Sequence, residues 1–348
     1  MDLVNVLWLG MPVWIWLSFI AVVLTLLAFD LGVMHRGSRE IGVRESLNMS
    51  ALYIGLGLAW GLAVYWIYHS EAGVQSIDPQ ISGALSAGDR AWTAVQLYVT
   101  GYLVEKTLAL DNVFIISMIF TYFAVPREYQ HRVLFWGILG VIVLRAIMIG
   151  LGAALVMQFS WIMYLFAIFL IATGIKMIVM MDQQPDISTN PVLKFMRKRL
   201  RVTETLHGER FWVRLPDPKT GQLVAWATPL FLCLVLVEIA DLVFAIDSVP
   251  AIFAITPDAF IVYTSNIFAI LGLRALYFAL AAMVHRFHYL KYALSLVLIV
   301  IGAKIFLGDW LFDGKVPAML SLTITTGILA GGIVFSLWKT REEASVGP

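Results

Sequence analysis

Five acidic residues lie inside stretches of sequence that are otherwise almost wholly apolar. Glu105 and Asp111 stand within EKTLALDNV, and Glu238, Asp241 and Asp247 stand within EIADLVFAIDSV. An ionisable side chain at the centre of a membrane-spanning helix costs about 2.5 to 3.5 kcal/mol, so proteins keep such residues there chiefly for function. Carboxylate oxygens are hard ligands of the kind that Mg²⁺, Ca²⁺ and Mn²⁺ prefer. We therefore predict that these five acids form a site for a divalent metal cation.

The spacing of the acids limits how they can share one cation. Glu238 and Asp241 are three residues apart, about 60° around a helix, so one cation could contact both carboxylates. Glu105 and Asp111 are six residues apart, as are Asp241 and Asp247. The members of each of these pairs would diverge by about 120° on a straight helix. They therefore need a break in the helix or a shared cavity.

Pro250 is the candidate for such a break. It cannot donate a backbone hydrogen bond to the carbonyl of Ile246, and it disfavours helical geometry at the residue before it. The freed carbonyl would be an oxygen ligand beside Asp247, as in transporters with discontinuous helices. A simple proline kink whose carbonyl is satisfied by Ser248 is the alternative interpretation.

Other polar residues could support the acids. Five acids against Lys106, Arg145 and Arg274 leave a charge of about −2, which one divalent cation or two protons would neutralise. Carboxylates that lie close together also hold protons more readily, so protons could replace the metal. The arginines could instead pair with acids to hold helices together, and Asp30 could be a vestibule ligand or merely a boundary residue. The possible supporting residues are Asn112, Ser248, Ile246, Asp30, Lys106, Arg145 and Arg274.

Histidine and cysteine are scarce where the acids lie. All six histidines fall at the ends of apolar stretches or between them, and Cys233 is the one cysteine. A zinc or copper site, a thiolate cage and a redox pair of cysteines are therefore disfavoured. The formal net charge of +1 gives no global field that would attract nucleic acid. We expect no resident cofactor, no nucleic acid partner and no enzymatic activity.

The elements that must position the acids are membrane-spanning helices. The chain of 348 residues is 60% hydrophobic, with a mean hydropathy of +0.85, which is too apolar for an ordinary water-soluble domain. About 20 apolar residues are needed to cross a bilayer as helix, and nine stretches meet that length. We place the nine spans at 12–34, 49–69, 96–123, 133–157, 160–181, 229–252, 258–284, 289–308 and 316–338.

Basic residues indicate how these spans are oriented. The connections after spans 1, 3, 5 and 7, together with the C-terminal tail, hold 17 of the 24 Lys and Arg residues. Because Lys and Arg accumulate in short cytoplasmic loops, the N-terminus is expected outside and the C-terminus in the cytoplasm. The one sizeable cytoplasmic loop, 182–227, is predicted to hold a basic helix from Asn190 and Pro191 and a hairpin, resting on the inner leaflet or serving a regulatory partner.

An internal repeat unites the spans. Glu105 and Asp111 align with Asp241 and Asp247 at an offset of 136 residues. Arg145 in VLRAIM aligns with Arg274 in GLRALY at 129, and Lys176 in ATGIKMI aligns with Lys304 in VIGAKIF at 128. Three spans per unit is an odd number, so repeat one (96–181) and repeat two (229–308) would be inverted relative to each other, as in many secondary transporters. Chance similarity between apolar helices is the alternative.

The two acidic segments, EKTLALDNVF and EIADLVFAIDSVPAIFAIT, resemble signature segments of the TerC family of integral membrane proteins. The resemblance extends through GYLVEK, SNIFAILGLRALYF and GIKM over nearly the whole chain, and it looks closest to the Alx branch. It implies nine spans, membership of the LysE-type transporter superfamily and export of Mn²⁺. The family's acidic positions carry over onto the five acids above, with Asn112 and Ser248 beside them. The Glu238-Ile-Ala-Asp241 spacing is also similar to the Glu-x-Gly-Asp element of related exchangers, although Ala240 replaces the glycine.

Together these patterns predict an all-α polytopic membrane protein, one membrane domain over residues 1–348 of the plasma (inner) membrane. Its expected activity is export of Mn²⁺, with Ca²⁺ or Mg²⁺ as other possible cations, in exchange for protons at a carboxylate site between spans 3 and 6. The lipid bilayer, the cation and protons are its expected partners, and the sequence leaves its oligomeric state open. A non-transporting membrane scaffold or assembly factor is the alternative function. An intramembrane aspartyl protease using Asp111 and Asp247 is a remote one, because it would be expected to carry Gly-x-Gly-Asp where this chain has Phe244-Ala245-Ile246 before Asp247.

Overall fold

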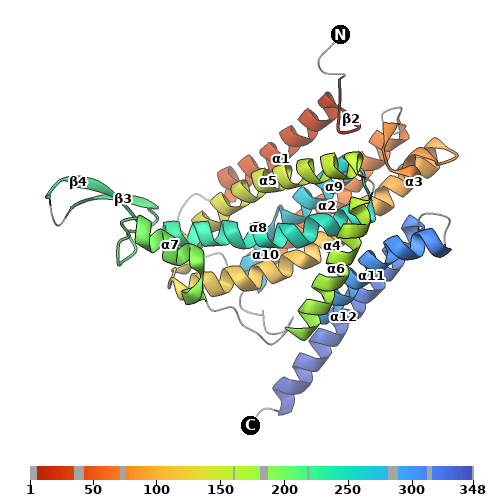
Figure 1. Ribbon diagram of the computed structural model, residues 1–348. Coiled ribbons are helices and arrows are strands. Elements are labelled where there is room, and N and C mark those ends of the chain that lie inside the picture. The colour runs from red at the N-terminus through yellow and green to blue at the C-terminus, as the bar shows by residue number, and fades with distance from the viewer. Residues whose placement is uncertain are drawn as a thin grey trace.

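The computed structural model describes residues 6–34, 43–70, 75–159, 161–180, 187–217, 220–280, 289–311 and 316–346. In that part of the chain the protein is a bundle of long helices, with strands confined to two short antiparallel hairpins (Figure 1). The long helices are α1 (Val13–Met34), α2 (Val43–His69), α4 (Ala87–Tyr122), α5 (Arg127–Gln158), α6 (Ile162–Val179), α8 (Pro229–Ile255), α11 (Leu290–Leu311) and α12 (Ala318–Val346). The shorter helical elements are α3 (Pro79–Ser82), η3 (Ile187–Thr189), α7 (Pro191–Arg199), α9 (Ala259–Ile270) and α10 (Leu273–Leu280). The hairpins are β1 (Leu7–Trp8) with β2 (Met11–Pro12), and β3 (Trp212–Pro216) with β4 (Leu223–Ala227).

Every predicted span coincides with a helix, and span 7 coincides with the pair α9 and α10. Among the described residues, six helices are long and apolar enough to cross a membrane, or seven when the bent pair α9–α10 counts as one span. These six are α2, α5, α6, α8, α11 and α12. The other two predicted spans fall on α1, whose apolar part Val13–Phe29 is shorter, and on α4, which carries the acids of the first signature segment. The fold is therefore an all-α polytopic membrane protein, and the count of nine spans stays a prediction.

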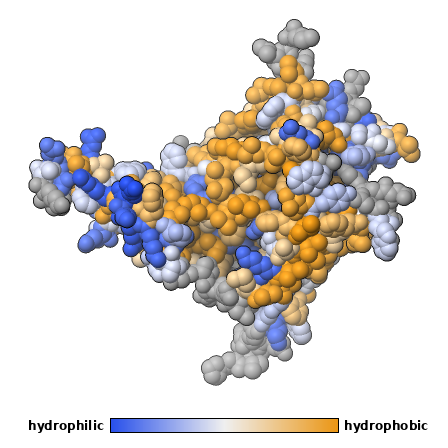
Figure 2. Space-filling model, viewed as in Figure 1, coloured by the Kyte–Doolittle hydropathy of each residue, from blue (hydrophilic) through white to orange (hydrophobic). Residues whose placement is uncertain are grey.

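The outer surface of the helices is apolar, as a lipid solvent requires. Large apolar side chains such as Leu62, Trp66 and Val179 are 70%, 74% and 77% exposed. On a water-soluble protein, exposed apolar patches of this extent would mark an interaction site. Figure 2 shows hydrophobic residues covering the helical body, whereas hydrophilic residues gather over α7 and the β3–β4 hairpin. The helical body therefore faces the bilayer and the hairpin projects away from it.

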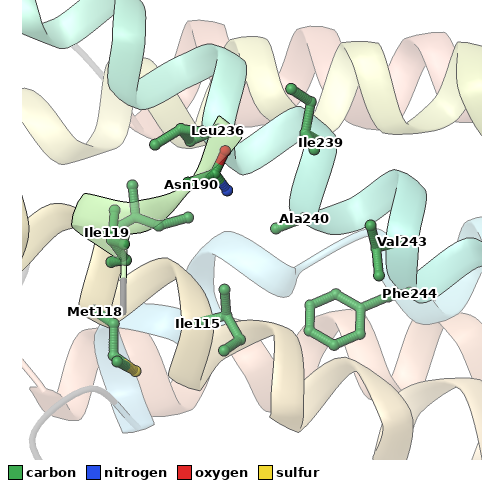
Figure 3. A pocket seen from close by; sticks show the side chains of 10 residues that line it. Ile115, Met118, Ile119, Asn190, Leu236, Ile239, Ala240, Val243 and Phe244 are labelled. Atoms are coloured by element: carbon green, nitrogen blue, oxygen red, sulfur yellow. The ribbon is translucent and has the colours of Figure 1, made fainter. Parts of the chain in front are cut away.

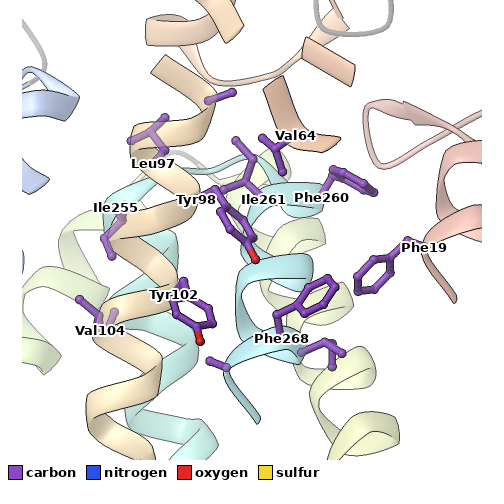
Figure 4. Close-up of a cluster of buried hydrophobic side chains, with 14 of the residues drawn as sticks. Phe19, Val64, Leu97, Tyr98, Tyr102, Val104, Ile255, Phe260, Ile261 and Phe268 are labelled. Atoms are coloured by element: carbon purple, nitrogen blue, oxygen red, sulfur yellow. The ribbon is translucent and has the colours of Figure 1, made fainter. Parts of the chain in front are cut away.

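Aromatic side chains fill the core between α1, α2, α4 and α9 (Figure 4). Phe19 of α1 lies against Phe260 and Phe268 of α9, with ring centroids 6.2 and 6.0 Å apart. Tyr98 and Tyr102 of α4 stack at 6.3 Å, and the Tyr98 hydroxyl donates a hydrogen bond to the Gly57 carbonyl at 2.7 Å. The packed rings fix α9, and with it the polar residues at its C-terminal half, against α4.

The helix break lies at Gly272, not at Pro250. Helix α8 continues through Pro250 to Ile255, so the predicted discontinuity beside Asp247 is absent from it. Helices α9 and α10 instead meet at an angle of 40°, and Gly272 between them has φ of +82°. Only glycine adopts this left-handed geometry without strain. The Lys106 ammonium donates a hydrogen bond to the carbonyl of Ala269 at 2.9 Å, which satisfies one of the carbonyls left free at the end of α9.

The helices of the two predicted repeats pack in exchanged pairs: α4 lies against α9, α5 against α8, and α6 against α11. In the last pair, a Cβ at Gly174 would come within 2.7 Å of the Ser295 carbonyl oxygen, and one at Gly302 within 2.7 Å of the Ala167 carbonyl oxygen. Gly302 and Ser295 lie 128 residues after Gly174 and Ala167. The two contacts are therefore reciprocal, as a pseudo-twofold relation between the predicted repeats requires.

The segment before α8 forms the elements expected from its sequence. Asn190 caps α7, since its side-chain oxygen accepts hydrogen bonds from the backbone N–H groups of Val192 and Leu193 at 2.9 and 3.4 Å. Leu193 and Met196 are buried against the end of α8. The β3–β4 hairpin projects from this end of the molecule (Figure 1). The helix and the hairpin thus cap one end of the α4–α8 pair.

Candidate functional site

Arg145 of α5 lies at the centre of a buried polar cluster. Its Nη1 atom is 2.6 Å from Glu105 Oε1, and it donates hydrogen bonds to Ser248 Oγ at 2.8 Å and Asn266 Oδ1 at 2.7 Å. Its Nη2 atom is 3.8 Å from Asp241 Oδ1. One guanidinium thus joins α4, α5, α8 and α9. Because a buried carboxylate is costly without a counter-charge, Arg145 also explains how two acids are tolerated here.

The two acids bridged by Arg145 are those that align in the predicted repeats. Glu105 is fully buried in α4, and the Asn266 side-chain amide lies 3.5 Å from its Oε2. Asp241 is buried in α8, and the Asn112 amide donates a hydrogen bond to its Oδ1 at 3.3 Å. The cluster therefore contains one acid from each repeat, with Asn112 from repeat one and Ser248 and Asn266 from repeat two.

Three oxygen atoms of this region are buried without a hydrogen-bond partner. They are Asn112 Oδ1, Asp241 Oδ2 and Glu238 Oε2. A buried acceptor that lacks a partner costs about 1 to 3 kcal/mol. All three are hard oxygen donors, so they fit the ligand chemistry of a divalent cation such as Mn²⁺.

Glu238 reaches this region because α5 has a glycine opposite it. A Cβ at Gly140 would overlap both carboxylate oxygens of Glu238. The carboxylate therefore occupies the space that any larger residue at position 140 would fill.

A larger cavity lies on the other side of Arg145. It has a volume of about 700 Å³, and its lining includes Asp111 and Asp247 together with Glu105 and Arg145. It brings together Glu105 and Asp111, as their six-residue spacing requires, whereas Asp241 does not share it with Asp247. The other polar lining residues are Asn112, Thr173, Lys176, Ser248 and Lys291.

Each aspartate of the cavity faces a lysine. Asp247 lies 3.4 Å from the Thr173 hydroxyl and interacts electrostatically with Lys176. Asp111 interacts electrostatically with Lys291, whose ammonium lies 4.9 Å from the centroid of the Phe114 ring. The cavity therefore holds acids and bases in pairs, not a cluster of acids alone.

A separate apolar pocket of about 270 Å³ lies between α4 and α8, next to Ile187 and Asn190 at the start of α7 (Figure 3). Phe244 and Val243 of α8 and Ile115 of α4 line both this pocket and the larger cavity. Phe244 also lines a small cavity of about 20 Å³ beside Asp241, Asn112 and Arg274. Phe244 is therefore the side chain that the three spaces share.

The remaining predicted residues are scattered. Arg274 is buried in α10 and lines the small cavity beside Asp241. The Ile246 side chain lines the large cavity, while Lys106 binds the end of α9. The side chain of Asp30, in α1, lies outside the described part of the chain.

The structure thus divides the predicted five-acid site into two zones that meet at Arg145. Asp241 lines the small cavity and interacts electrostatically with Glu238. Asp111 and Asp247 line the large cavity together with Glu105, which also contacts Arg145. Within the described residues, no group of three or more His, Cys, Asp or Glu side chains is close enough to hold a metal ion. Binding of a cation by several of the acids therefore requires their rearrangement or help from Asn112 and Ser248.

Sequence reasoning did not assign Thr173, Lys176 and Lys291 to the site. Lys176 could have been found, because it is one of the landmarks of the predicted repeat. Lys291 stands at the start of α11 among other basic residues, and Thr173 precedes Gly174 in an apolar helix. Neither carries a signal of its own until the helices are packed.

The fold and the buried charges define a class: a polytopic α-helical membrane protein with paired ionisable groups in its interior. Within that class the comparisons identify the family. The family model described as "Integral membrane protein TerC family" matches residues 90–344. The chain belongs to the TerC family.

Similar proteins cover nearly the whole chain. An "Uncharacterized membrane protein" of Rickettsia bellii is 44% identical over 322 residues, 92% of this chain and 96% of its own length. A protein of Escherichia coli K12 named "Putative membrane-bound redox modulator Alx" is 42% identical over 94% of this chain and 95% of its own length. A protein of Photorhabdus laumondii with the same name is 41% identical over 97% of this chain and 98% of its own length. No solved structure matches the chain.

Proposed function

We propose that this protein exports a hard divalent cation, with Mn²⁺ as the first candidate, from the cytoplasm in exchange for protons. The observation that carries the proposal is the set of three buried oxygens of Asn112, Glu238 and Asp241 that lack hydrogen-bond partners. A hard cation would compensate the cost of burying these atoms. Ca²⁺ and Mg²⁺ have the same ligand preference, so the test includes them.

The large cavity supplies the second part of the proposal. Asp111 and Asp247 line it together, one from each predicted repeat. Sites near the midplane between inverted repeats are typical of secondary transporters. A cation leaving the buried oxygens would meet these two carboxylates next, and protons returning through the same cavity would neutralise them.

The name of the Alx relatives raises a redox role as well. In this chain Cys233 is the one cysteine and is buried in α8, so thiol and disulfide exchange within the chain is not available to it. Under the present proposal, a redox role shared with those relatives would act through the transported cation. No enzymatic step is part of the proposal.

Flux of Mn²⁺ into proteoliposomes with an imposed pH gradient tests the proposal. We expect gradient-driven flux for the intact protein. For Asp247→Asn we expect the flux to fall at least tenfold, which corresponds to a free-energy difference of about 1.4 kcal/mol or more. Asp217→Asn is the matched control, because Asp217 pairs with Arg201 at 2.9 Å beside the β3–β4 hairpin, away from the cavity. Absence of flux in both gradient directions, with protein shown to be folded, would favour the scaffold or assembly function instead.

A further inference from the structure

The contacts of Arg145 are those that a bound cation would make. Its guanidinium contacts Glu105 of repeat one and Asp241 of repeat two, the two acids that align in the predicted repeats. It also donates hydrogen bonds to two neutral oxygens, those of Ser248 and Asn266. Carboxylate, hydroxyl and amide oxygens are the donors that a hard cation prefers.

The bonding of Arg145 is incomplete, and there is space beside it. Its Nε atom is buried without a hydrogen-bond partner. Asp241 Oδ2 likewise lacks one. A purely structural buried arginine is expected to have its donors satisfied. The cavity of about 700 Å³ that Arg145 lines is also lined by Asp111 and Asp247, two further carboxylates.

The charges of this cavity balance without any bound ion. Its described lining has three acids, Glu105, Asp111 and Asp247, and three bases, Arg145, Lys176 and Lys291. A divalent cation entering the cavity would therefore add two positive charges to a neutral lining. Binding of the cation in this cavity therefore requires that a basic side chain move away from the carboxylates that it contacts.

Resting on the transport function proposed above, we propose that Arg145 is a tethered cation. It occupies the place between Glu105 and Asp241 when no metal is bound. When the metal enters, Arg145 yields these two carboxylates and turns toward Asp247 and Asp111. It acts as a positioning residue, because it competes with the cation for ligands and does not bind the cation itself.

This role has a kinetic consequence. An empty carrier with bare buried carboxylates changes conformation slowly, because charges inside a membrane protein are costly when unpaired. Arg145 removes that cost on the empty return step. It has no such role while metal is bound, so exchange of Mn²⁺ for Mn²⁺ does not depend on it.

The test compares net uptake of Mn²⁺ with exchange of labelled for unlabelled Mn²⁺ in proteoliposomes at one fixed pH. In Arg145→Gln we expect exchange to continue and net uptake to fall at least about tenfold relative to exchange, given the energies measured for buried charge pairs. Equilibrium binding of Mn²⁺ to the purified variant is expected to tighten by a similar factor of about ten or more, because the competing charge is gone.

Two variants serve as controls. Arg201→Gln makes the same chemical change at an ion pair beside the β3–β4 hairpin and should behave as the wild type in all assays. Arg145→Lys keeps the positive charge and leaves every oxygen that the cation could contact in place. Its ratio of net uptake to exchange should stay near the wild-type ratio, and it tests the proposal even if Arg145→Gln fails to fold.

The outcomes separate the two proposals. If the wild type moves no Mn²⁺ in either mode, the transport function itself fails. If the wild type is active but folded Arg145→Gln loses exchange and net uptake equally, or binds Mn²⁺ no more tightly, Arg145 is structural and the tethered-cation role is overturned. Folded Arg145→Lys that keeps exchange but loses net uptake would overturn it as well.

Discussion

The position of the Glu238 side chain depends on a glycine, Gly140, which has no Cβ. The carboxylate lies against Gly140 of α5, where the absence of a Cβ leaves the space that both oxygens occupy. Its Oε2 atom is buried without a hydrogen-bond partner. The close contact with α5 covers this atom, and under the proposed function it leaves the oxygen free to bind a cation.

Gly140→Ala should therefore reduce cation transport, because the new methyl group overlaps both Glu238 oxygens and displaces the carboxylate. We expect at least a tenfold loss of Mn²⁺ flux in proteoliposomes, about 1.4 kcal/mol or more. Gly150→Ala in the same helix is the matched control, since nothing lies within 4 Å of a Cβ there. Both changes favour the helix by roughly 0.5 to 1 kcal/mol. Equal flux in the two variants would remove Glu238 from the site.

The sequence could predict which acids are buried but not how they divide. Apolar surroundings alone marked Glu105, Asp111 and Asp241 as interior residues. Whether two acids meet depends on the rotation of each helix about its axis, which packing decides. The guanidinium of Arg145 reaches Glu105 and Asp241 and not the cavity aspartates because α5 packs against α8 and α9. The spacing of the acids along the sequence therefore does not predict which of them Arg145 contacts.

At the scale of elements, two buried aspartates join the connections at one end of the bundle. Asp258 caps α9 and accepts hydrogen bonds from the Tyr68 hydroxyl at 2.7 Å and the Ser76 hydroxyl at 2.5 Å. Asp78 caps α3 and accepts one from the Thr256 hydroxyl at 2.6 Å. This clamp ties the end of α2 to the connection between α8 and α9.

The clamp should be sensitive to pH. Burial raises the pKa of Asp258 above its ordinary value of 3.8, despite the hydrogen bonds from Ser76 and Tyr68. The folded protein therefore binds the proton more tightly than the unfolded chain does. The resulting stabilisation is complete below pH 3.8 and is lost as the pH rises through the raised value in the folded protein.

Thermal unfolding of the purified protein in detergent measures this effect. As the pH rises above 3.8, the wild type should lose stability relative to Asp258→Asn, which cannot ionise. Asp89→Asn, at an exposed position in the first turn of α4, should keep the pH dependence of the wild type. If Asp258→Asn had the same pH dependence of stability as the wild type, Asp258 would not titrate in this range.

The helices themselves were predictable, because a bilayer demands long apolar stretches and each predicted range holds a helix. The capped helix and the hairpin before α8 were also predictable from Asn190, Pro191 and the turn residues between the strands. The predicted place of the helix break, at Pro250, was wrong. Pro250 lacks one hydrogen bond yet stays within α8, whereas the break needs the positive φ of Gly272. An isolated glycine in an apolar helix carries no such signal until its neighbours are known.

At the scale of the whole molecule, the distribution of basic residues predicts which end faces the cytoplasm. The segment with α7 and the β3–β4 hairpin is expected inside, and the start of α4 is expected outside. Glu204 and Asp89 are exposed at these two ends. Cys233, the chain's one cysteine, is buried and should not react with thiol reagents.

Cysteine labelling of intact cells tests this orientation. Asp89→Cys should react with a membrane-impermeant thiol reagent, and Glu204→Cys should react only after the membrane is permeabilised. Wild-type protein, with Cys233 alone, is the control for background labelling. The reverse pattern would invert the orientation and, with it, the proposed direction of export.

The break at Gly272 makes the two halves unequal. In the aligned repeats, Val143 occupies the position of Gly272, and α5 passes through it without a break. Valine is branched at Cβ and is strongly disfavoured at the φ of +82° that Gly272 adopts. In the transport cycle proposed above, the two halves therefore cannot exchange conformations. The inward-facing and outward-facing states of that cycle would differ in energy, so the carrier would have a preferred resting side even in a membrane without any gradient.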